Sequence, residues 1–178
     1  MFQNEKVDVY QMLEARDRRV VRQKRMLLEG KCPVICFTLN IPGPVKTSSQ
    51  FLWAFERGRR EVVELLQREG YIIKMNESEY RNTGFEYMAS VEADPIILKR
   101  KLTELEEKTP LGRLYDIDVI SPDGKKVSRN EIGKGRRKCI LCEEDAHVCG
   151  RNRTHTIEEL IDRVEQIILE EQKEESNV

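Results

Sequence analysis

The chain has 178 residues, of which 35% are charged and 39% are hydrophobic, and its formal net charge is −1. This composition is typical of a soluble globular protein and excludes a disordered or membrane-embedded one. No run of 18 apolar residues is present, and the N-terminus lacks the basic and apolar segments of a signal peptide. We therefore expect one domain over residues 1–178, located in the cytoplasm and without a membrane partner.

The small net charge conceals strong local clusters. Residues 16–25 are mostly basic, residues 134–138 read Lys-Gly-Arg-Arg-Lys, and residues 170–175 are mostly glutamate. Basic clusters on a nearly neutral chain favour a discrete polyanionic ligand, so no nucleic-acid partner is expected. The five cysteines are not expected to form disulfides in a reducing compartment.

In chain order, the first expected element is an amphipathic helix over residues 8–29, which is followed by Gly30. A buried strand is expected within 32–41, and it is interrupted by a Pro-Gly-Pro turn at 42–44. Ser49 is the expected cap of a helix over residues 50–69. The apolar stripe of the first helix is expected to contain Val9, Met12, Leu13, Val20, Leu27 and Leu28.

Further along the chain, a short strand at 71–74 is followed by a polar turn and a strand at 84–91. Asp94 and Pro95 predict the start of a helix that runs to about residue 108. A strand around 115–120 follows, and a capping box at Thr156 opens a C-terminal helix that extends to about residue 172.

These elements predict an α+β fold. The order β-α-β-β-α-β over residues 33–120 is that of a ferredoxin-like core, flanked by a basic helix at 8–30 and a Cys/His segment with a final helix at 134–172. In that topology the first and fourth strands are antiparallel neighbours. Asn40-Ile-Pro-Gly43 is then expected to lie near Gly112-Arg113.

Asp116 and Asp118 are the most informative pair of residues. They are two positions apart in an apolar strand, so both carboxylates leave the same face about 7 Å apart along the chain. Two carboxylates in this arrangement can bind Mg²⁺ together with phosphate oxygens. The alternative is a half-exposed strand that places charges on its solvent side.

Two further segments offer candidate phosphate ligands. Arg16, Arg19 and Arg22 share one side of the first helix, and arginine binds phosphate oxygens bidentately. The rigid loop from Asn40 to Lys46 carries glycine and lysine, although its spacing is not that of a P-loop. A solvated basic face and a purely structural turn are the corresponding alternatives.

A Cys/His cluster lies near the C-terminus. Cys139, Cys142, Cys149 and His155 provide three thiolates and one imidazole, and the first two cysteines have the usual spacing of a zinc knuckle. The donor types favour a structural Zn²⁺ site, with His147 as a competing ligand. Reduced buried thiols are the alternative.

Taken together, these motifs resemble the CitX family, the apo-citrate lyase phosphoribosyl-dephospho-CoA transferases, also called holo-citrate lyase synthases. The resemblance spans about residues 8–168 in the same order. Its parts are Ala15-Arg-Asp-Arg-Arg-Val-Val-Arg-Gln23, Thr38-Leu-Asn-Ile-Pro-Gly-Pro44, Gly112-Arg-Leu-Tyr-Asp-Ile-Asp-Val119, Ser128-Arg129 and the segment Cys139 to His155.

The resemblance implies a nucleotidyl transfer. The donor is 2'-(5''-triphosphoribosyl)-3'-dephospho-CoA, the acceptor is a serine of the citrate lyase acyl carrier subunit, and diphosphate is released. It further implies Mg²⁺ at Asp116 and Asp118 and a catalytic role for Arg113. Substrate binding is then expected from Arg16, Arg19, Arg22, Asn40, Gly43, Lys46 and Arg129.

The sequence departs from many nucleotidyltransferase folds in one respect. No Gly-Ser pair precedes Asp116 at the usual distance, and the third carboxylate of such sites is not identifiable, because Asp123 lies in a turn. These departures argue against a nucleotidyltransferase-like fold, which is the alternative to the ferredoxin-like core, and leave the two-aspartate metal site unaffected. A zinc-stabilised module that binds a carrier protein or nucleic acid without catalysis, and a sister enzyme acting on malonate decarboxylase, remain alternative functions.

Overall fold

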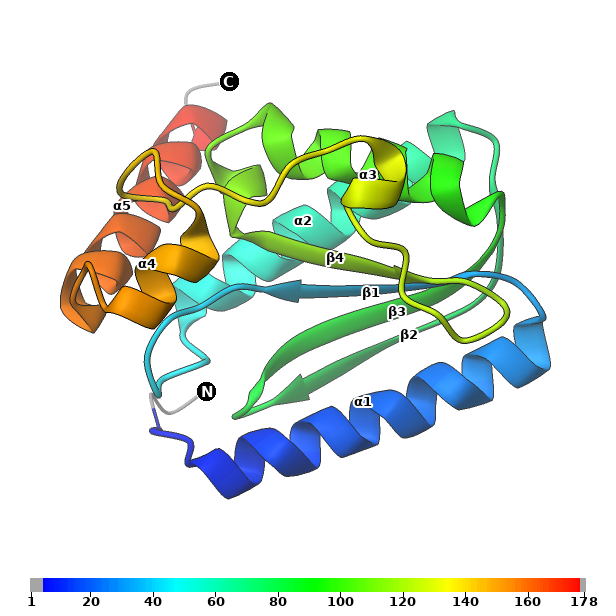
Figure 1. The fold of residues 1–178 in the computed structure, drawn as a ribbon, viewed down its shortest axis with the longest axis horizontal. Coiled ribbons are helices and arrows are strands. Elements are labelled where there is room, and N and C mark those ends of the chain that lie inside the picture. Colours follow the sequence, from blue (N-terminus) through cyan, green and yellow to red (C-terminus); the bar gives the residue numbers. More distant parts are fainter. Residues whose placement is uncertain (1–4, 177–178) are drawn as a thin grey trace.

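Figure 1 shows a computed structural model of the protein, which describes residues 5–176. The ends of the expected domain, 1–4 and 177–178, lie outside the described residues. Two short 3₁₀ turns occupy Leu111–Leu114 and Asn130–Ile132. The helices are α1 (Val9–Gly30), α2 (Ser49–Arg68), α3 (Pro95–Lys108), α4 (Ala146–Asn152) and α5 (Ile157–Ser176), and the strands are β1 (Val34–Leu39), β2 (Ile72–Arg81), β3 (Gly84–Glu92) and β4 (Tyr115–Ile120).

The strands of residues 5–176 form one sheet in the order β2-β3-β1-β4, and every neighbouring pair is antiparallel. The chain is therefore a mixed α+β protein, and the predicted pairing of its first and fourth strands is confirmed. The end of β1 also lies next to the segment that precedes β4, because the N–H of Asn40 donates to the carbonyl of Leu114 at 2.8 Å.

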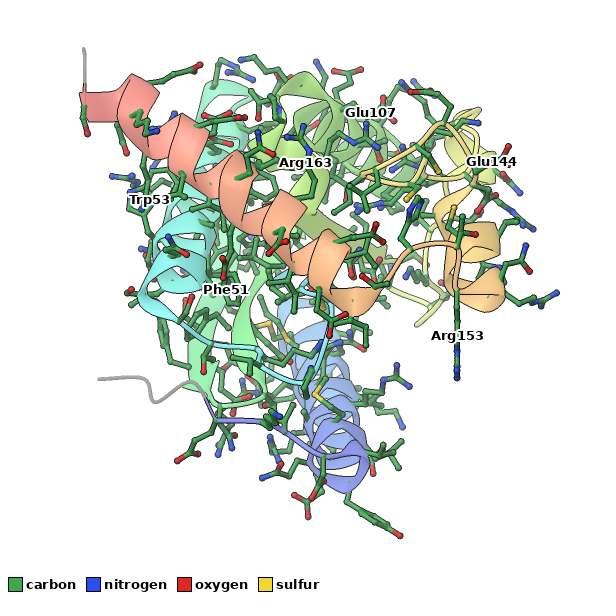
Figure 2. The ribbon with its side chains drawn as sticks, turned by 90° about the vertical axis from the view of Figure 1, so that its left-hand side faces the viewer. Phe51, Trp53, Glu107, Glu144, Arg153 and Arg163 are labelled. Atoms are coloured by element: carbon green, nitrogen blue, oxygen red, sulfur yellow. The ribbon has the colours of Figure 1, made fainter. Side chains whose placement is uncertain are left out.

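The sheet has helices on both faces. Helices α2 and α3 cover one face and α1 lies across the other (Figure 1). Alternate residues of β1 divide between the two sides: Phe37 belongs to the main core with α2 and α3, whereas Cys36 packs in a small cluster with Met26 of α1. Helix α5 crosses α2 and contributes Val164 to the main core (Figure 2).

A glycine brings α2 close to the sheet. A Cβ atom at Gly58 would lie 2.5 Å from Cζ of Phe37 and 2.8 Å from Cε1 of Tyr115, which is too close for any side chain. Phe37 in turn stacks on Phe55 with ring centroids 5.3 Å apart. Phe37 also meets the ring of Tyr115, the residue before Asp116 on β4, edge to face at 5.3 Å, and both phenylalanine rings are buried.

The apolar stripe predicted for the first helix is largely wrong. The buried residues of α1 are Ala15 and Met26, whereas Val9, Val20 and Leu28 are 72%, 44% and 77% exposed. The helix instead turns arginines toward the sheet, where they pair with glutamates. Charge pairing therefore sets the orientation of α1, and the spacing of apolar residues does not reveal it.

Three predicted boundaries also differ. The polar turn expected after residue 74 is the second half of β2, where polar side chains alternate along an edge strand. Ser48, not Ser49, caps α2 by accepting from the N–H of Phe51 at 3.1 Å. Helix α5 extends to Ser176, whereas its capping box at Thr156 is as predicted.

None of the helices that the structure describes is both long enough and apolar enough to cross a membrane.

Candidate active site

Asp116 and Asp118 lie on the face of β4 that is turned toward α1. Their register partners on β1 are Thr38 and Cys36, and Cys36 packs beneath α1. The two carboxylate side chains are 50% and 27% exposed. Strand alternation therefore gives both groups access to solvent on one face, as a shared ion would require.

Each of the two aspartates has a cation beside it. Asp118 Oδ1 lies 2.7 Å from Nζ of Lys126, and Asp116 Oδ1 lies 3.9 Å from Nη2 of Arg137. Lys126 is 58% exposed, so its ion pair with Asp118 is solvated and weak. The buried thiol of Cys36 is no nucleophile here, because burial raises its pKa to about 12.

A cavity of about 220 Å³, here called the small cavity, opens between α1, the loop after β1 and β4. Arg16 has no carboxylate partner among residues 5–176, so its charge is free to meet an anion. Asp118, Gly43 and Arg22 are not part of the lining. The cavity brings together five of the predicted site residues: Arg16, Arg19, Asn40, Lys46 and Asp116.

Arg19 and Arg22 are paired with glutamates of the sheet. Arg19 donates to Glu86 at 3.0 and 2.5 Å, and Arg22 donates to Glu77 at 2.8 Å, Glu79 at 2.6 Å and Glu86 at 3.0 Å. Burial opposes the charge of Arg19, yet its bond to Glu86 keeps its pKa above the ordinary value. These bonds attach α1 to the sheet, and Arg22 is only 14% exposed.

Glu86 is a member of the site that the sequence analysis missed. It lines the small cavity and lies in register with Thr38, which is itself in register with Asp116. The sequence pattern could have revealed it, because strand alternation places Glu86 on the same face of β3 as Met88 and Ser90. A glutamate on a buried strand face indicates a charged partner from another element.

The loop from Asn40 to Lys46 is held from several sides. Lys46 Nζ donates to the carbonyl of Ile41 at 2.5 Å, and burial lowers the pKa of this lysine. Val7 donates to the carbonyl of Pro44 at 2.9 Å. Gly43 has a φ of +74°, a backbone conformation that favours glycine, and a Cβ atom there would lie only 3.0 Å from Cγ2 of Ile157 in α5.

Arg129 and Arg113 lie outside the small cavity. Arg129 donates to Glu106 at 2.9 Å and also bonds Glu107, which fixes the segment after β4 onto α3. Arg113 donates only to the backbone carbonyls of Lys138 and Cys139, at 3.2 and 2.9 Å. Among residues 5–176 its guanidinium therefore has no carboxylate partner.

A buried charge cluster behind β4 was also not predicted. Glu106 is 3% exposed, accepts the N–H of Ile117 at 2.9 Å and lies 2.5 Å from Nη2 of Arg137. Lys99, also buried, donates to the carbonyl of Ile117 at 2.5 Å, and burial lowers its pKa. Burial raises the pKa of Glu106 and the surrounding cations oppose that shift.

The Cys/His cluster assembles as its spacing predicts. The ligand atoms of Cys139, Cys142, Cys149 and His155 all lie within 4.8 Å of one another, and His147 is not among them. Cys142 Sγ lies 3.5 Å from Cys149 Sγ and 3.3 Å from His155 Nε2. Tetrahedral zinc, with Zn–S bonds of about 2.3 Å, separates its sulfur ligands by about 3.8 Å, so the donor set fits this ion.

Local structure positions each of these ligands. Cys139 and Cys142 lie in a turn. This turn is closed by a hydrogen bond of 2.8 Å, which the N–H of Cys139 donates to the carbonyl of Glu144. Cys149 belongs to α4, whose first turn is capped by Asp145. His155 lies next to Thr156, the residue that caps α5. Three separate backbone segments thus converge on one point, which a bound ion would hold together.

We expect the purified protein to contain about one zinc ion per chain. Cys142→Ser should lose that zinc and lose amide protection within residues 138–156, while the strands keep theirs, because the cluster lies outside the sheet. Metal analysis and hydrogen exchange measure both effects. Cys32→Ser, which changes a cysteine outside the cluster, is the matched control. An unchanged zinc content in Cys142→Ser would show that the cluster is not a metal site.

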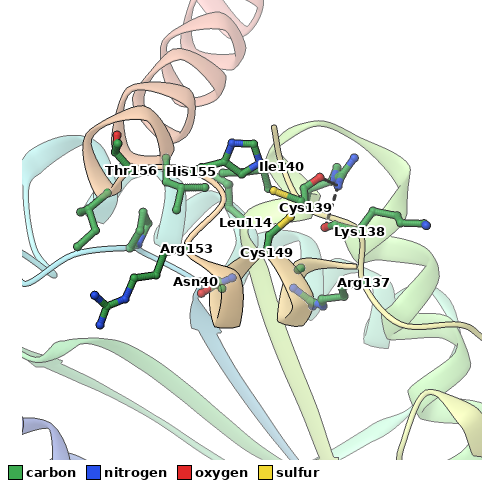
Figure 3. A pocket seen from close by; sticks show the side chains of 16 residues that line it. Asn40, Leu114, Arg137, Lys138, Cys139, Ile140, Cys149, Arg153, His155 and Thr156 are labelled. Carbon is green, nitrogen blue, oxygen red and sulfur yellow. Dashed lines mark hydrogen bonds between the residues drawn. The ribbon is translucent and has the colours of Figure 1, made fainter. Parts of the chain in front are cut away.

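A second cavity of about 780 Å³, here called the large cavity, lies between the Cys/His segment, the start of α5 and the end of β1 (Figure 3). Arg137 and Arg153 lie on opposite sides of it in Figure 3. Asn40 lines both cavities. The lining of the large cavity includes the apolar residues Pro42, Leu114, Ile140, Ile157 and Leu160 and the cluster ligands Cys139, Cys149 and His155.

Comparison with known proteins identifies the class. Residues 7–171 match the profile of CitX, described as apo-citrate lyase phosphoribosyl-dephospho-CoA transferase, so the chain is a member of a family of transferases. Two relatives of that name, from Escherichia coli O1:K1 / APEC and from Shigella boydii serotype 18, are each 36% identical over 162 residues, which is 91% of this chain and 88% of each relative. The chain belongs to the CitX family, as the resemblance of its motifs predicted.

Proposed function

We propose that this protein transfers the phosphoribosyl-dephospho-CoA group from 2'-(5''-triphosphoribosyl)-3'-dephospho-CoA to a serine of the acyl carrier subunit of apo-citrate lyase. Membership of the CitX family supports this function. The observation that carries it is the small cavity, where the free cation Arg16 and the half-buried Lys46 lie around the carboxylate of Asp116. Cations beside a metal-binding carboxylate suit a polyphosphate donor.

In the proposed reaction the serine oxygen attacks the α-phosphorus in line. A P–O bond to serine forms as the P–O bond to diphosphate breaks, and the proton of the serine hydroxyl passes to solvent water. Arg16, Arg19 and Lys46 bind the oxygens of the triphosphate and stabilise the leaving diphosphate. Asn40 orients the donor at the mouth of the cavity, and Arg113 binds a phosphate from the side of the large cavity. Arg22, Arg129 and Gly43 support these residues through ion pairs and packing.

Asp116 and Asp118 would hold Mg²⁺. The residues fit this ion, because two partly exposed carboxylates on one strand face offer the oxygen ligands that it prefers. Bound Mg²⁺ neutralises phosphate charge and activates the incoming hydroxyl. Lys126 must then release Asp118. Breaking this solvated ion pair costs little free energy, because the lysine is exposed.

We further propose that the sheet and its helices form a single ferredoxin-like domain. The element order and the strand order β2-β3-β1-β4 support that assignment. In this arrangement the basic helix and the Cys/His segment are additions to the core that approach the end of β1 from opposite faces.

The non-catalytic alternative, a zinc-stabilised binding module, is not favoured, because the family profile covers nearly the whole chain and describes a transferase. An adaptor would also have no need of the carboxylate pair. The two functions therefore differ in a direct assay.

The test is the intact mass of the carrier. The full-length protein is mixed with the apo acyl carrier subunit, the triphosphoribosyl-dephospho-CoA donor and Mg²⁺. We expect the carrier to gain the mass of the phosphoribosyl-dephospho-CoA group, and EDTA to prevent that gain. A competent carrier that keeps its mass would refute the transferase function.

A further inference from the structure

We propose that the large cavity binds the dephospho-CoA portion of the donor, while the small cavity holds its triphosphate. This inference rests on the proposed function and assigns the substrate to two adjoining subsites. The donor would then run past Asn40, with its adenosine and pantetheine arm on the side of the Cys/His segment.

The volumes of the two cavities favour this division. The small cavity, at about 220 Å³, has room for a chain of phosphates. The large cavity, at about 780 Å³, is within the range of sites that enclose drug-sized ligands. A nucleoside with a long thiol arm needs the larger volume, so only one of the two cavities can take it.

The lining of the large cavity matches the chemistry of that ligand. Leu114, Ile140 and Leu160 provide apolar wall for an adenine ring or for the hydrocarbon parts of the arm. Dephospho-CoA also carries a diphosphate, which requires cations. Arg113, Lys138 and Arg153 line the cavity and, among residues 5–176, none of them has a carboxylate partner.

The unpaired cations of the large cavity differ in this respect from the arginines of the basic helix α1. The sequence pattern predicted phosphate binding by Arg19 and Arg22. Their charges are balanced, however, by ion pairs with Glu77, Glu79 and Glu86. Of the cations around the large cavity, Arg113, Lys138 and Arg153 keep their charge available for a ligand, whereas Arg137 is paired with Glu106. An anion entering the protein therefore meets less compensated positive charge on this side.

The two cavities are close enough for one ligand. Asn40 belongs to both linings. Arg137 lines the large cavity and its Nη2 atom lies 3.9 Å from Asp116, which lines the small one. A donor with its nucleotide arm in the large cavity thus has its triphosphate next to the proposed metal ligands. A segment of the carrier is the competing occupant, and it becomes an outcome of the test.

The experiment measures binding of 3'-dephospho-CoA alone to the full-length protein by calorimetry, without carrier. We expect Lys138→Gln combined with Arg153→Gln to weaken binding by about tenfold or more, because each change removes a charge-assisted contact. Arg151→Gln changes an exposed arginine of the same segment outside the cavity lining and should leave binding unchanged.

A second variant tests the volume directly. Gly150 lines the large cavity, and a Cβ atom there would meet no atom within 4 Å, so the side chain of Gly150→Phe starts in open space and is expected to occupy part of the cavity. It should abolish dephospho-CoA binding and leave the thermal unfolding midpoint near that of the unchanged protein. Binding of inorganic triphosphate with Mg²⁺ should be retained in Gly150→Phe and lost in Arg16→Gln.

The results separate this inference from the proposed function. If the carrier is modified but all variants bind dephospho-CoA equally, the proposed subsite is overturned and the transferase function stands. The same holds if the carrier is modified but the protein does not bind dephospho-CoA. Loss of carrier binding, instead of dephospho-CoA binding, in Lys138→Gln with Arg153→Gln would also overturn it. Specific dephospho-CoA binding without any carrier modification would retain the subsite and refute the transferase.

Discussion

Replacing Asp118 with asparagine is expected to reduce transfer to the carrier by about 1000-fold, since a bound metal supplies several kcal/mol of charge stabilisation in the transition state and each 1.4 kcal/mol is about tenfold in rate. Asparagine keeps the shape of the side chain and removes the charge that Mg²⁺ requires. Asp116→Asn should show the same loss. The measurement is the initial rate of carrier mass gain at saturating donor.

The fold should survive these changes. The ion pair between Asp118 and Lys126 is partly exposed, and ion pairs at the protein surface contribute about 0–1 kcal/mol. The free energy of unfolding in urea should therefore stay within about 1 kcal/mol of that of the unchanged protein. Asp162→Asn, at an exposed position on α5, is the matched control.

Lys126→Gln separates metal binding from ion pairing. If Asp118 acted only by holding Lys126, the two single variants would lose the same activity. If Asp118 binds Mg²⁺, Lys126→Gln should retain transfer and require less Mg²⁺ for half-maximal rate, because the competing cation is gone. Equal losses in the two variants would contradict the metal site.

Local sequence patterns predicted those parts of the site whose members lie close together in the chain. Alternation along one strand was enough to place Asp116 and Asp118 on one face. Cys139 and His155 lie within one short segment, so their spacing already indicated a shared site. The β-α-β-β-α-β order likewise followed from the succession of local signals, with the pairing of β1 and β4 as its consequence.

The remaining features depend on partners distant in sequence. Arg22 reaches Glu77 across 55 positions and Glu86 across 64, and no helical period encodes that choice. The basic face of α1 therefore resembled a phosphate site, although most of its charge is used within the fold. Neither the sharing of Asn40 by two cavities nor the burial of Glu106 has a local signature, because each depends on how separate elements pack.

Glu106→Ala is expected to lower the free energy of unfolding by about 3–5 kcal/mol, the usual result of removing one partner from a buried ion pair. Lys99 is 4% exposed, and the side chains of Arg129 and Arg137 are 19% and 27% exposed. Arg129 and Arg137 would lose the carboxylate that they pair with, Lys99 would lose a nearby compensating charge, and the N–H of Ile117 would lose its acceptor. Urea unfolding at pH 7 measures the change.

Two comparisons identify the cause. Glu104→Gln, on the exposed side of α3, should change the unfolding free energy by no more than about 0.5 kcal/mol. Glu106→Gln should be less damaging than Glu106→Ala, because an amide oxygen still accepts from Ile117 while the charge is lost. A loss below about 1 kcal/mol in Glu106→Ala would show that the buried cluster does not stabilise the fold.

Loss of the Glu106 carboxylate should also affect the proposed metal site. Arg137 is held between Glu106 and the carbonyl of Tyr115, at 2.5 and 2.6 Å, and in that position it stays 3.9 Å from Asp116. Without Glu106 this guanidinium is free to pair closely with Asp116 and to compete with Mg²⁺. We therefore expect Glu106→Gln to raise the Mg²⁺ concentration needed for half-maximal transfer, an effect that loss of stability alone would not produce.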